Sequence, residues 1–233
     1  MRTTRFYFDS VTNKNYAMKF RTALIITGLI LLAGSCIPSL YPLYRSSDLL
    51  IDDRMDGVFD AGDNSYWKIC RIDPQFEKKV PEGWKHYNSG YTYRLTVREK
   101  NGAVENFAMH LLKLGKNRYV DFFPVNYKIR HEFLAMHLVP THIFAKAEVG
   151  DSTLVIHWFD MDWLEELIKT NRIKISYVEV GERYVLSTPT EELQKFILKY
   201  ANDSTTFIEA DTLRKTNVES ALGNYSIRNG AIN

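Results

Sequence analysis

The chain has 233 residues, of which 45% are apolar, 25% charged and 13% aromatic. These proportions are typical of a globular protein and exclude a disordered or collagen-like chain. Two cysteines exclude a disulfide scaffold and a zinc site built from four thiolates. At roughly 100–200 residues per domain, we expect one main domain.

The first 35 residues have the layout of a secretory signal. A basic flank, Lys19-Phe20-Arg21, precedes an apolar run from Thr22 to Ile37. At about 1.5 Å per residue a helix of this length reaches about 24 Å, which is shorter than the ~30 Å hydrocarbon core of a bilayer. We therefore expect a cleaved signal over residues 1–35 rather than a permanent transmembrane helix. Translation can start at Met1 or at Met18, and the sequence leaves both open.

The apolar run ends in Leu31-Leu32-Ala33-Gly34-Ser35-Cys36. This segment resembles the lipobox of bacterial lipoproteins, in which small residues precede a cysteine that is lipidated and becomes the new N-terminus. The resemblance implies a lipid anchor with acyl chains such as palmitate on Cys36, and hence attachment to a membrane. Because Ile37 rather than aspartate follows the cysteine, it favours the outer membrane, with the protein facing the periplasm.

The charge of the chain belongs largely to its leader. Residues 1–35 hold five basic residues and one acidic residue, so their removal turns a net charge of +2 into a slightly negative one. A near-neutral chain lacks the basic surface of nucleic-acid binders. We therefore expect no nucleic-acid partner.

Residues 36–47 contain Pro38 and Pro42 and predict a tether that lies on the domain or on the membrane. From residue 57 to residue 125 the pattern predicts strands joined by short turns. Apolar residues in the segment 91–98 alternate with polar ones, which indicates a half-buried strand. Asn101-Gly102 then predicts a hairpin turn. Further strands are expected over 137–149, 153–159, 173–180 and 183–187.

Two helices are expected in the C-terminal half. Asp162 stands three residues before Glu165, the spacing of an N-terminal capping box. Thr188 as the cap and Pro189 at the first helical position predict a second helix. Its apolar stripe recurs with helical spacing at Leu193, Phe196, Ile197 and Tyr200.

These elements predict a mainly β fold. An antiparallel meander would form either an open, curved sheet or a closed lipocalin-like barrel, with the two helices packed against it. The expected organisation is a signal over 1–35, a tether over 36–47, a single β domain with helices over 48–208, and a polar C-terminal tail over 209–233.

Four segments resemble a family of bacterial lipoproteins with a lipocalin-like barrel. They are Ser39-Leu40-Tyr41-Pro42-Leu43-Tyr44, the stretch from Leu138 to Lys146, Asp162-Trp163-Leu164, and the stretch from Thr188 to Leu193. The resemblance covers most of residues 36–208. It implies a barrel behind a lipid anchor. It implies no catalytic residues, because the family has no agreed activity.

Two groups of side chains are candidates for a site. His137, His142 and His157 lie on expected neighbouring strands and would be the ligands of a metal site if they converged. The alternative is three ordinary strand histidines, which we favour. Aromatic residues could instead line a cavity for an apolar ligand, or simply fill the barrel. The candidates for such a lining are Tyr91, Tyr93, Phe107, Tyr119 and Trp158.

The sequence therefore favours a lipid-anchored envelope protein without catalytic activity, which binds a small apolar ligand or a protein partner. No cofactor is expected. Two alternatives remain at this point: a histidine-dependent metal hydrolase, and a structural or assembly factor of the envelope.

Overall fold

The computed structural model describes residues 36–72, 90–125, 129, 131–181 and 183–217. The chain divides into two compact units, residues 1–35 and residues 36–233, and the fold reported below is that of the second. The signal predicted over residues 1–35 lies outside the described residues.

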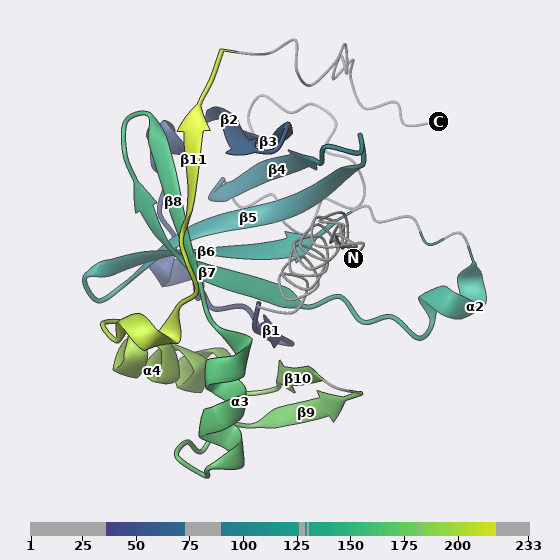
Figure 1. Cartoon of the computed structure of the whole chain (residues 1–233), viewed down its shortest axis with the longest axis vertical. Helices are drawn as coiled ribbons and strands as arrows, with labels where there is room; N and C mark the ends of the chain where they lie inside the picture. Colours follow the sequence, from purple (N-terminus) through teal and green to yellow (C-terminus); the bar gives the residue numbers. More distant parts are fainter. Residues whose placement is uncertain (1–35, 73–89, 126–128, 130, 182, 218–233) are drawn as a thin grey trace, which may run out of the picture. The chain divides into compact units, whose positions relative to one another are not determined.

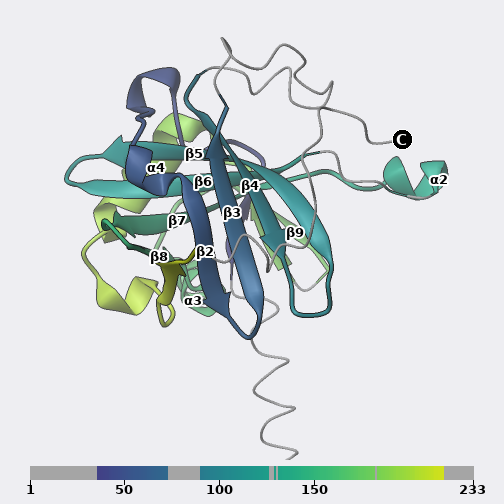
Figure 2. The same cartoon turned by 90° about the horizontal axis from the view of Figure 1, so that it is seen from above.

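Eight antiparallel strands close into a barrel (Figures 1 and 2). Seven of them follow one another around the barrel, and β11, the last strand among the described residues, lies between β8 and β2. The circle is completed where β6 pairs with β7, for instance Val120 with Ala145. The strands are β2 (Gly57–Gly62), β3 (Ser65–Arg71), β4 (Thr92–Arg98), β5 (Val104–Leu114), β6 (Asn117–Pro124), β7 (His142–Val149), β8 (Thr153–Trp158) and β11 (Asp211–Lys215). Of the two predicted alternatives, the closed barrel is therefore correct.

The alternation of residue types explains why these segments pair in this register. On β4, Tyr93 and Leu95 point into the barrel, while their neighbours face outward. The connection between β5 and β6 has only two residues, because Leu114 pairs with Asn117. Gly115 has a positive φ of 60° there, as tight hairpin turns require.

The interior of the barrel is packed with side chains from all eight strands. They form one continuous cluster, whose largest fully buried members are Phe59, Tyr93, Ile69 and Leu95. One end is closed by a short helix, η3 (Asp53–Met55), whose Met55 is fully buried among the interior side chains. The interior of the barrel is therefore filled with side chains, and η3 closes one of its ends.

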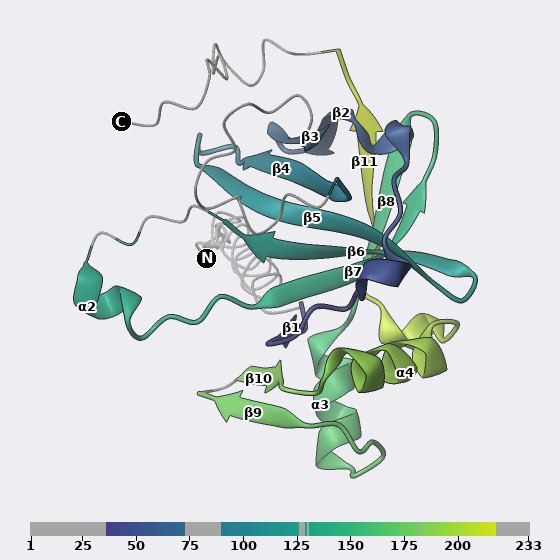
Figure 3. The same cartoon turned by 180° about the vertical axis from the view of Figure 1, so that it is seen from behind.

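A second layer covers part of the outer wall (Figure 3). It contains helices α3 (Met161–Lys169) and α4 (Thr190–Tyr200), with Leu193 and Ile197 of α4 buried as the helical spacing predicted. Three further strands extend the sheet from β7 in the order β1 (Pro38–Ser39), β10 (Arg183–Leu186) and β9 (Tyr177–Val180). The remaining elements are α2 (Glu132–Ala135), η2 (Ser46–Asp48) and η5 (Ser204–Thr206).

The segment predicted as a tether is part of this second layer. Ile37 and Leu43 are fully buried, and Leu40 donates its backbone N–H to Leu186 at 2.8 Å. We call residues 37–49 the strap. Prolines exclude a regular helix here, but they still permit one short strand and apolar packing. The buried Ile37 and Leu43 place the segment on the domain, one of the two predicted positions.

The β domain extends past the predicted boundary at residue 208. Residues 211–215 form β11, which closes the barrel between β8 and β2, and its Leu213 is buried. The sequence Asp-Thr-Leu-Arg-Lys carries a single apolar residue, because only one side chain of this short strand needs to fill the interior.

Both predicted helices form, but their first residues differ from the prediction. The carboxylate of Asp160, not of Asp162, accepts the capping hydrogen bond of α3 from the Asp162 N–H at 2.9 Å. The hydroxyl of Thr188 bonds to both backbone groups of Ser176 instead of capping α4. The predicted strands 137–149 and 173–180 are shortened to β7 and β9.

Candidate functional site

Aromatic side chains gather at the end of the barrel opposite the plug. The ring of Phe122 on β6 lies 5.8 Å from that of Trp67 on β3 and 5.6 Å from that of Trp158 on β8. Since β3 and β6 are separated by two strands, the first contact spans the lumen. Val97 and Phe107 are also half-buried at this end. We call these five residues the aromatic mouth.

Two features fix the geometry of the aromatic mouth. Strand alternation directs Trp67, Val97 and Phe107 to the interior face, where Trp67 and Val97 form a cross-strand pair. The indole N–H of Trp158 donates to the carboxylate of Asp211 at 2.7 Å, which holds the ring in one orientation. The mouth therefore presents four partly exposed apolar side chains around the buried Phe122, the kind of surface that binds an apolar group.

The opposite end is held by polar contacts. The Tyr93 hydroxyl donates to the backbone oxygen of Asp52 at 3.1 Å and accepts from its N–H at 2.7 Å. Burial raises the pKa of Tyr93 to about 12. The Asp52 carboxylate accepts hydrogen bonds from Arg54 and Arg118, and the bond from Arg54 helps to hold its pKa at about 2. These contacts fix the plug at this end of the barrel.

The predicted aromatic ligand residues separate into four places. Phe107 and Trp158 belong to the mouth, whereas Tyr93 is fully buried at the plugged end. Tyr119 lies on the outer wall, stacked against Phe159 with ring centroids 6.5 Å apart. Tyr91 precedes β4 and is exposed. Tyr119 and Tyr91 therefore do not face the interior, because residue type alone tells neither which face of a strand is inside nor where the strand begins.

Sequence reasoning missed Trp67 and Phe122, which contribute the central contact of the mouth. A signal was available for Trp67, because it lies two residues before Ile69 and therefore on the same face of the strand. Phe122 stands next to Phe123 on β6, and only the pairing register shows that Phe122 faces inward.

The three candidate metal histidines lie in three different surroundings. His137 is exposed and its ring contacts Phe133 at 4.8 Å, while His157 bonds to Glu148 at 3.0 Å. His142 is buried on the outer wall of β7. Within the part of the chain that the structure describes, no group of three or more histidines, cysteines or carboxylates could hold a metal ion. The fold thus does not bring His137, His142 and His157 together.

His142 instead belongs to a buried polar cluster beneath the strap. Its Nδ1 lies 2.7 Å from the carboxylate of Asp121, which is fully buried. The same carboxylate accepts the backbone N–H of Leu43 in the strap at 2.8 Å. Burial raises the pKa of Asp121, and the bonds from His142 and Leu43 offset part of that rise.

A second imidazole completes this cluster. His110 is the cross-strand neighbour of Asp121, and its Nε2 lies 3.0 Å from the hydroxyl of Thr92. The ring of Tyr44 from the strap covers His110 at 4.4 Å. Burial lowers the pKa of His110 to about 4, so it is neutral at pH 7. Because the strap covers these groups, the cluster is suited to holding the strap in place.

The proposed lipidation residue lies at the edge of the folded unit. Cys36 is half-buried and directly precedes the fully buried Ile37. Among the described residues, no helix is both long and apolar enough to span a bilayer.

Comparisons with protein-family models, with curated proteins and with solved structures gave no match for this chain.

Proposed function

We propose that the protein is a lipid-anchored binding module of the bacterial cell envelope. It is attached through Cys36 and binds an apolar group at the aromatic mouth of its barrel. The observation that carries the proposal is the mouth itself, where the partly exposed Trp67 and Trp158 both contact the buried Phe122 above a filled interior. Aromatic rings that gather with partly exposed faces favour contact with an apolar group.

The packing of the interior limits what can bind. Side chains of Phe59, Tyr93 and Leu95 occupy the lumen below the mouth, so a ligand that fills the barrel would have to displace them. The mouth suits a group that rests on the rings, such as the end of an acyl chain or an apolar side chain of a partner.

The anchor is supported by separate observations. The small residues before Cys36 and the apolar run that precedes them resemble a lipobox. The compact unit of the fold begins at Cys36, which is the residue that a cut after Ser35 would leave at the N-terminus. Several acyl chains would hold the protein firmly, since each buried methylene contributes about 0.8 kcal/mol. The residue after the cysteine favours the outer membrane.

Quenching of tryptophan fluorescence by a brominated fatty acid tests the mouth. Bromine quenches only indoles that it approaches closely, so we expect saturable quenching that falls in Trp67→Phe and Trp158→Phe. The matched control is Trp163→Phe. Trp163 belongs to α3 and packs against Phe196 and Tyr200 of α4, away from the mouth. Quenching that is unsaturable, or that depends on Trp163 alone, would contradict binding at the mouth.

Metabolic labelling tests the anchor. Cells that express the full chain are grown with radiolabelled palmitate, and the Cys36→Ser chain serves as the comparison. We expect label on the wild-type protein only, with the variant released from the membrane fraction. Equal labelling of both chains would overturn the assignment of Cys36.

A further inference from the structure

Exposed apolar side chains are unevenly distributed over the described residues. Thirteen large apolar side chains are exposed there, and ten of them lie on three segments. One is the strap, another is β9, and the third is the stretch 131–139 between β6 and β7, which we call the arm.

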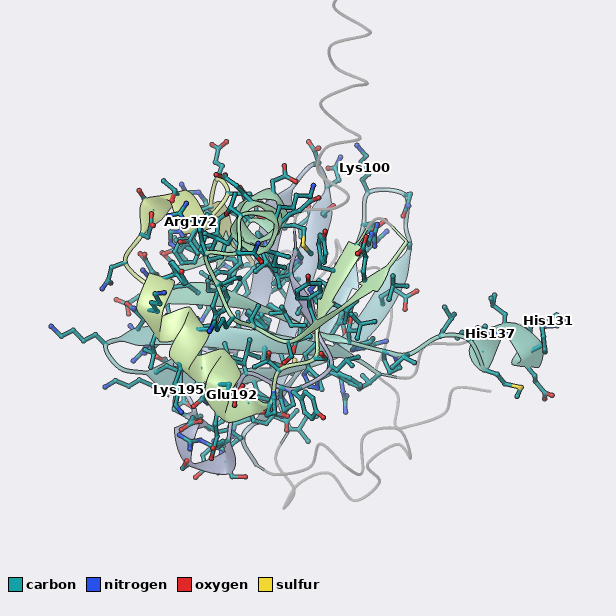
Figure 4. All side chains as sticks on the ribbon, turned by 90° about the horizontal axis from the view of Figure 1, so that it is seen from below. Lys100, His131, His137, Arg172, Glu192 and Lys195 are labelled. Carbon is teal, nitrogen blue, oxygen red and sulfur yellow. The ribbon has the colours of Figure 1, made fainter. Side chains whose placement is uncertain are left out.

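The arm carries the most exposed of these side chains. The exposed fractions are 81% for Met136, 71% for Val139 and 66% for Phe133. The backbone hydrogen bonds around α2 join residues of the arm to one another, such as Met136 to Glu132 at 3.2 Å. Figure 4 shows the arm, marked by His131 and His137, standing away from the barrel.

Strand pairing places the three segments next to one another. Ser39 of the strap pairs with His142 on one side and with Leu186 on the other. Leu186 pairs in turn with Tyr177 of β9, and His142 follows the arm by three residues. In Figures 1 and 3, β9 lies below β1, and its end points towards the side on which α2 stands out. The three segments form one surface around β1, which we call the β1 surface.

The same register places Cys36 and the aromatic mouth beside this surface. Phe122 of the mouth pairs with Ile143, and Ile143 pairs with Pro38. Two strand spacings of about 4.8 Å therefore separate Phe122 from Pro38. Cys36 precedes Ser39 by three residues, which span at most about 11 Å.

No linker separates Cys36 from the domain, because the next residue, Ile37, is fully buried. A cysteine held at a membrane by acyl chains would therefore bring the β1 surface to the lipid headgroups. Side chains such as Phe133, Met136 and Tyr41 are those that partition into the interfacial region of a bilayer.

We propose that the β1 surface is a membrane-contact surface, which rests on a phospholipid bilayer and inserts the side chains of the arm. The proposal rests on the anchoring at Cys36 proposed above. It adds that the barrel lies against the bilayer, with the aromatic mouth opening next to the lipid. The ligand of the mouth would then be reached from the membrane.

The test uses residues 36–233 with Cys36→Ser, so that no acyl chain contributes. Every described core residue lies between Ile37 and Leu213, so this segment holds the whole folded unit. Binding is measured by flotation with vesicles of phosphatidylethanolamine and phosphatidylglycerol. We expect weak binding that falls about tenfold in the double variant Met136→Ser, Val139→Ser.

The matched control is Val104→Ser with Leu198→Ser, two exposed apolar residues outside the β1 surface. This control should bind like the parent. Binding that is equal in both double variants, or no binding by the parent, would overturn the proposal. So would sedimentation showing that the parent is a dimer which the arm substitutions make monomeric, since the β1 surface would then be a contact between copies.

This design separates the two proposals. Because the tested protein lacks the anchor, palmitate labelling at Cys36 can fail while vesicle binding succeeds, and the reverse can also occur.

Discussion

Asp121 and His142 are joined by a 2.7 Å contact on the outer wall of the barrel, and the Asp121 carboxylate also accepts the backbone N–H of Leu43. The pair thus connects β6 and β7 to the strap, 78 residues away along the chain. Gln194 of α4 holds the strap from the other side by donating to the backbone oxygen of Leu43 at 2.8 Å. The position of Cys36 relative to the barrel follows from these contacts.

Replacement of Asp121 by alanine should loosen the strap. Asp121→Ala leaves the Leu43 N–H and the His142 ring without their acceptor in a buried site, which costs about 2–4 kcal/mol of unfolding free energy. Urea unfolding measures the loss, and hydrogen exchange should show faster exchange of the Leu43 amide. The control is Asp151→Ala. Because the Asp151 side chain is 97% exposed, this substitution should change the unfolding free energy by less than about 0.5 kcal/mol. Unchanged exchange at Leu43 would show that the carboxylate does not hold the strap.

The depressed pKa of His110 predicts a pH dependence of stability. In the unfolded chain this group takes up a proton below its ordinary value of 6.5, whereas in the folded protein it stays neutral down to about 4. Its contribution is therefore fully present above pH 6.5 and is lost as the pH falls towards 4, by up to about 3 kcal/mol.

The variant His110→Gln keeps a polar atom near Thr92 and removes the titration. Its unfolding free energy should vary less than that of the wild type across this window. If the curves of wild type and His110→Gln run parallel, His110 is not the group that titrates.

The plug should depend on the hydroxyl of Tyr93. The substitution Tyr93→Phe removes both hydrogen bonds to the backbone of Asp52 and should lower the unfolding free energy by about 1 kcal/mol. Because Tyr177 is exposed, Tyr177→Phe should change the unfolding free energy by less than about 0.5 kcal/mol. Equal effects of the two substitutions in chemical denaturation would refute this role of the hydroxyl.

Closure of the barrel by β11 is tested at Leu213. The variant Leu213→Ala removes a buried side chain from the interior cluster and should cost about 2–5 kcal/mol. Its neighbour Thr212 is exposed, so Thr212→Ala should be nearly neutral. If thermal unfolding shows only a small loss of unfolding free energy for both variants, β11 does not close the barrel.

Local patterns allowed much of the barrel to be predicted from the sequence. The strands β4, β5 and β6 follow one another with short turns, and the alternation in residues 92–98 identifies their inner face. The helical stripe of α4 is equally local. β11 was missed because Leu213 is its only apolar residue, and its place depends on partners far away in the chain.

The candidate site was predictable only in part, for the same reason. Trp158 and Phe107 were identified by residue type, but their meeting with Trp67 and Phe122 depends on contacts across the lumen. Asp121 gave a weaker signal as a single carboxylate among apolar residues on β6. Its partner from the strap could not be found without the three-dimensional fold.

The proposed function and the proposed membrane contact both depend on where the mature protein begins and on whether its N-terminus carries lipid. The intact mass of protein extracted from bacterial membranes tests this directly. We predict a chain that begins at Cys36, has lost residues 1–35 and carries the added mass of a diacylglyceryl group and acyl chains. A chain that keeps residues 1–35, or one that begins at another residue without added lipid, would contradict the account.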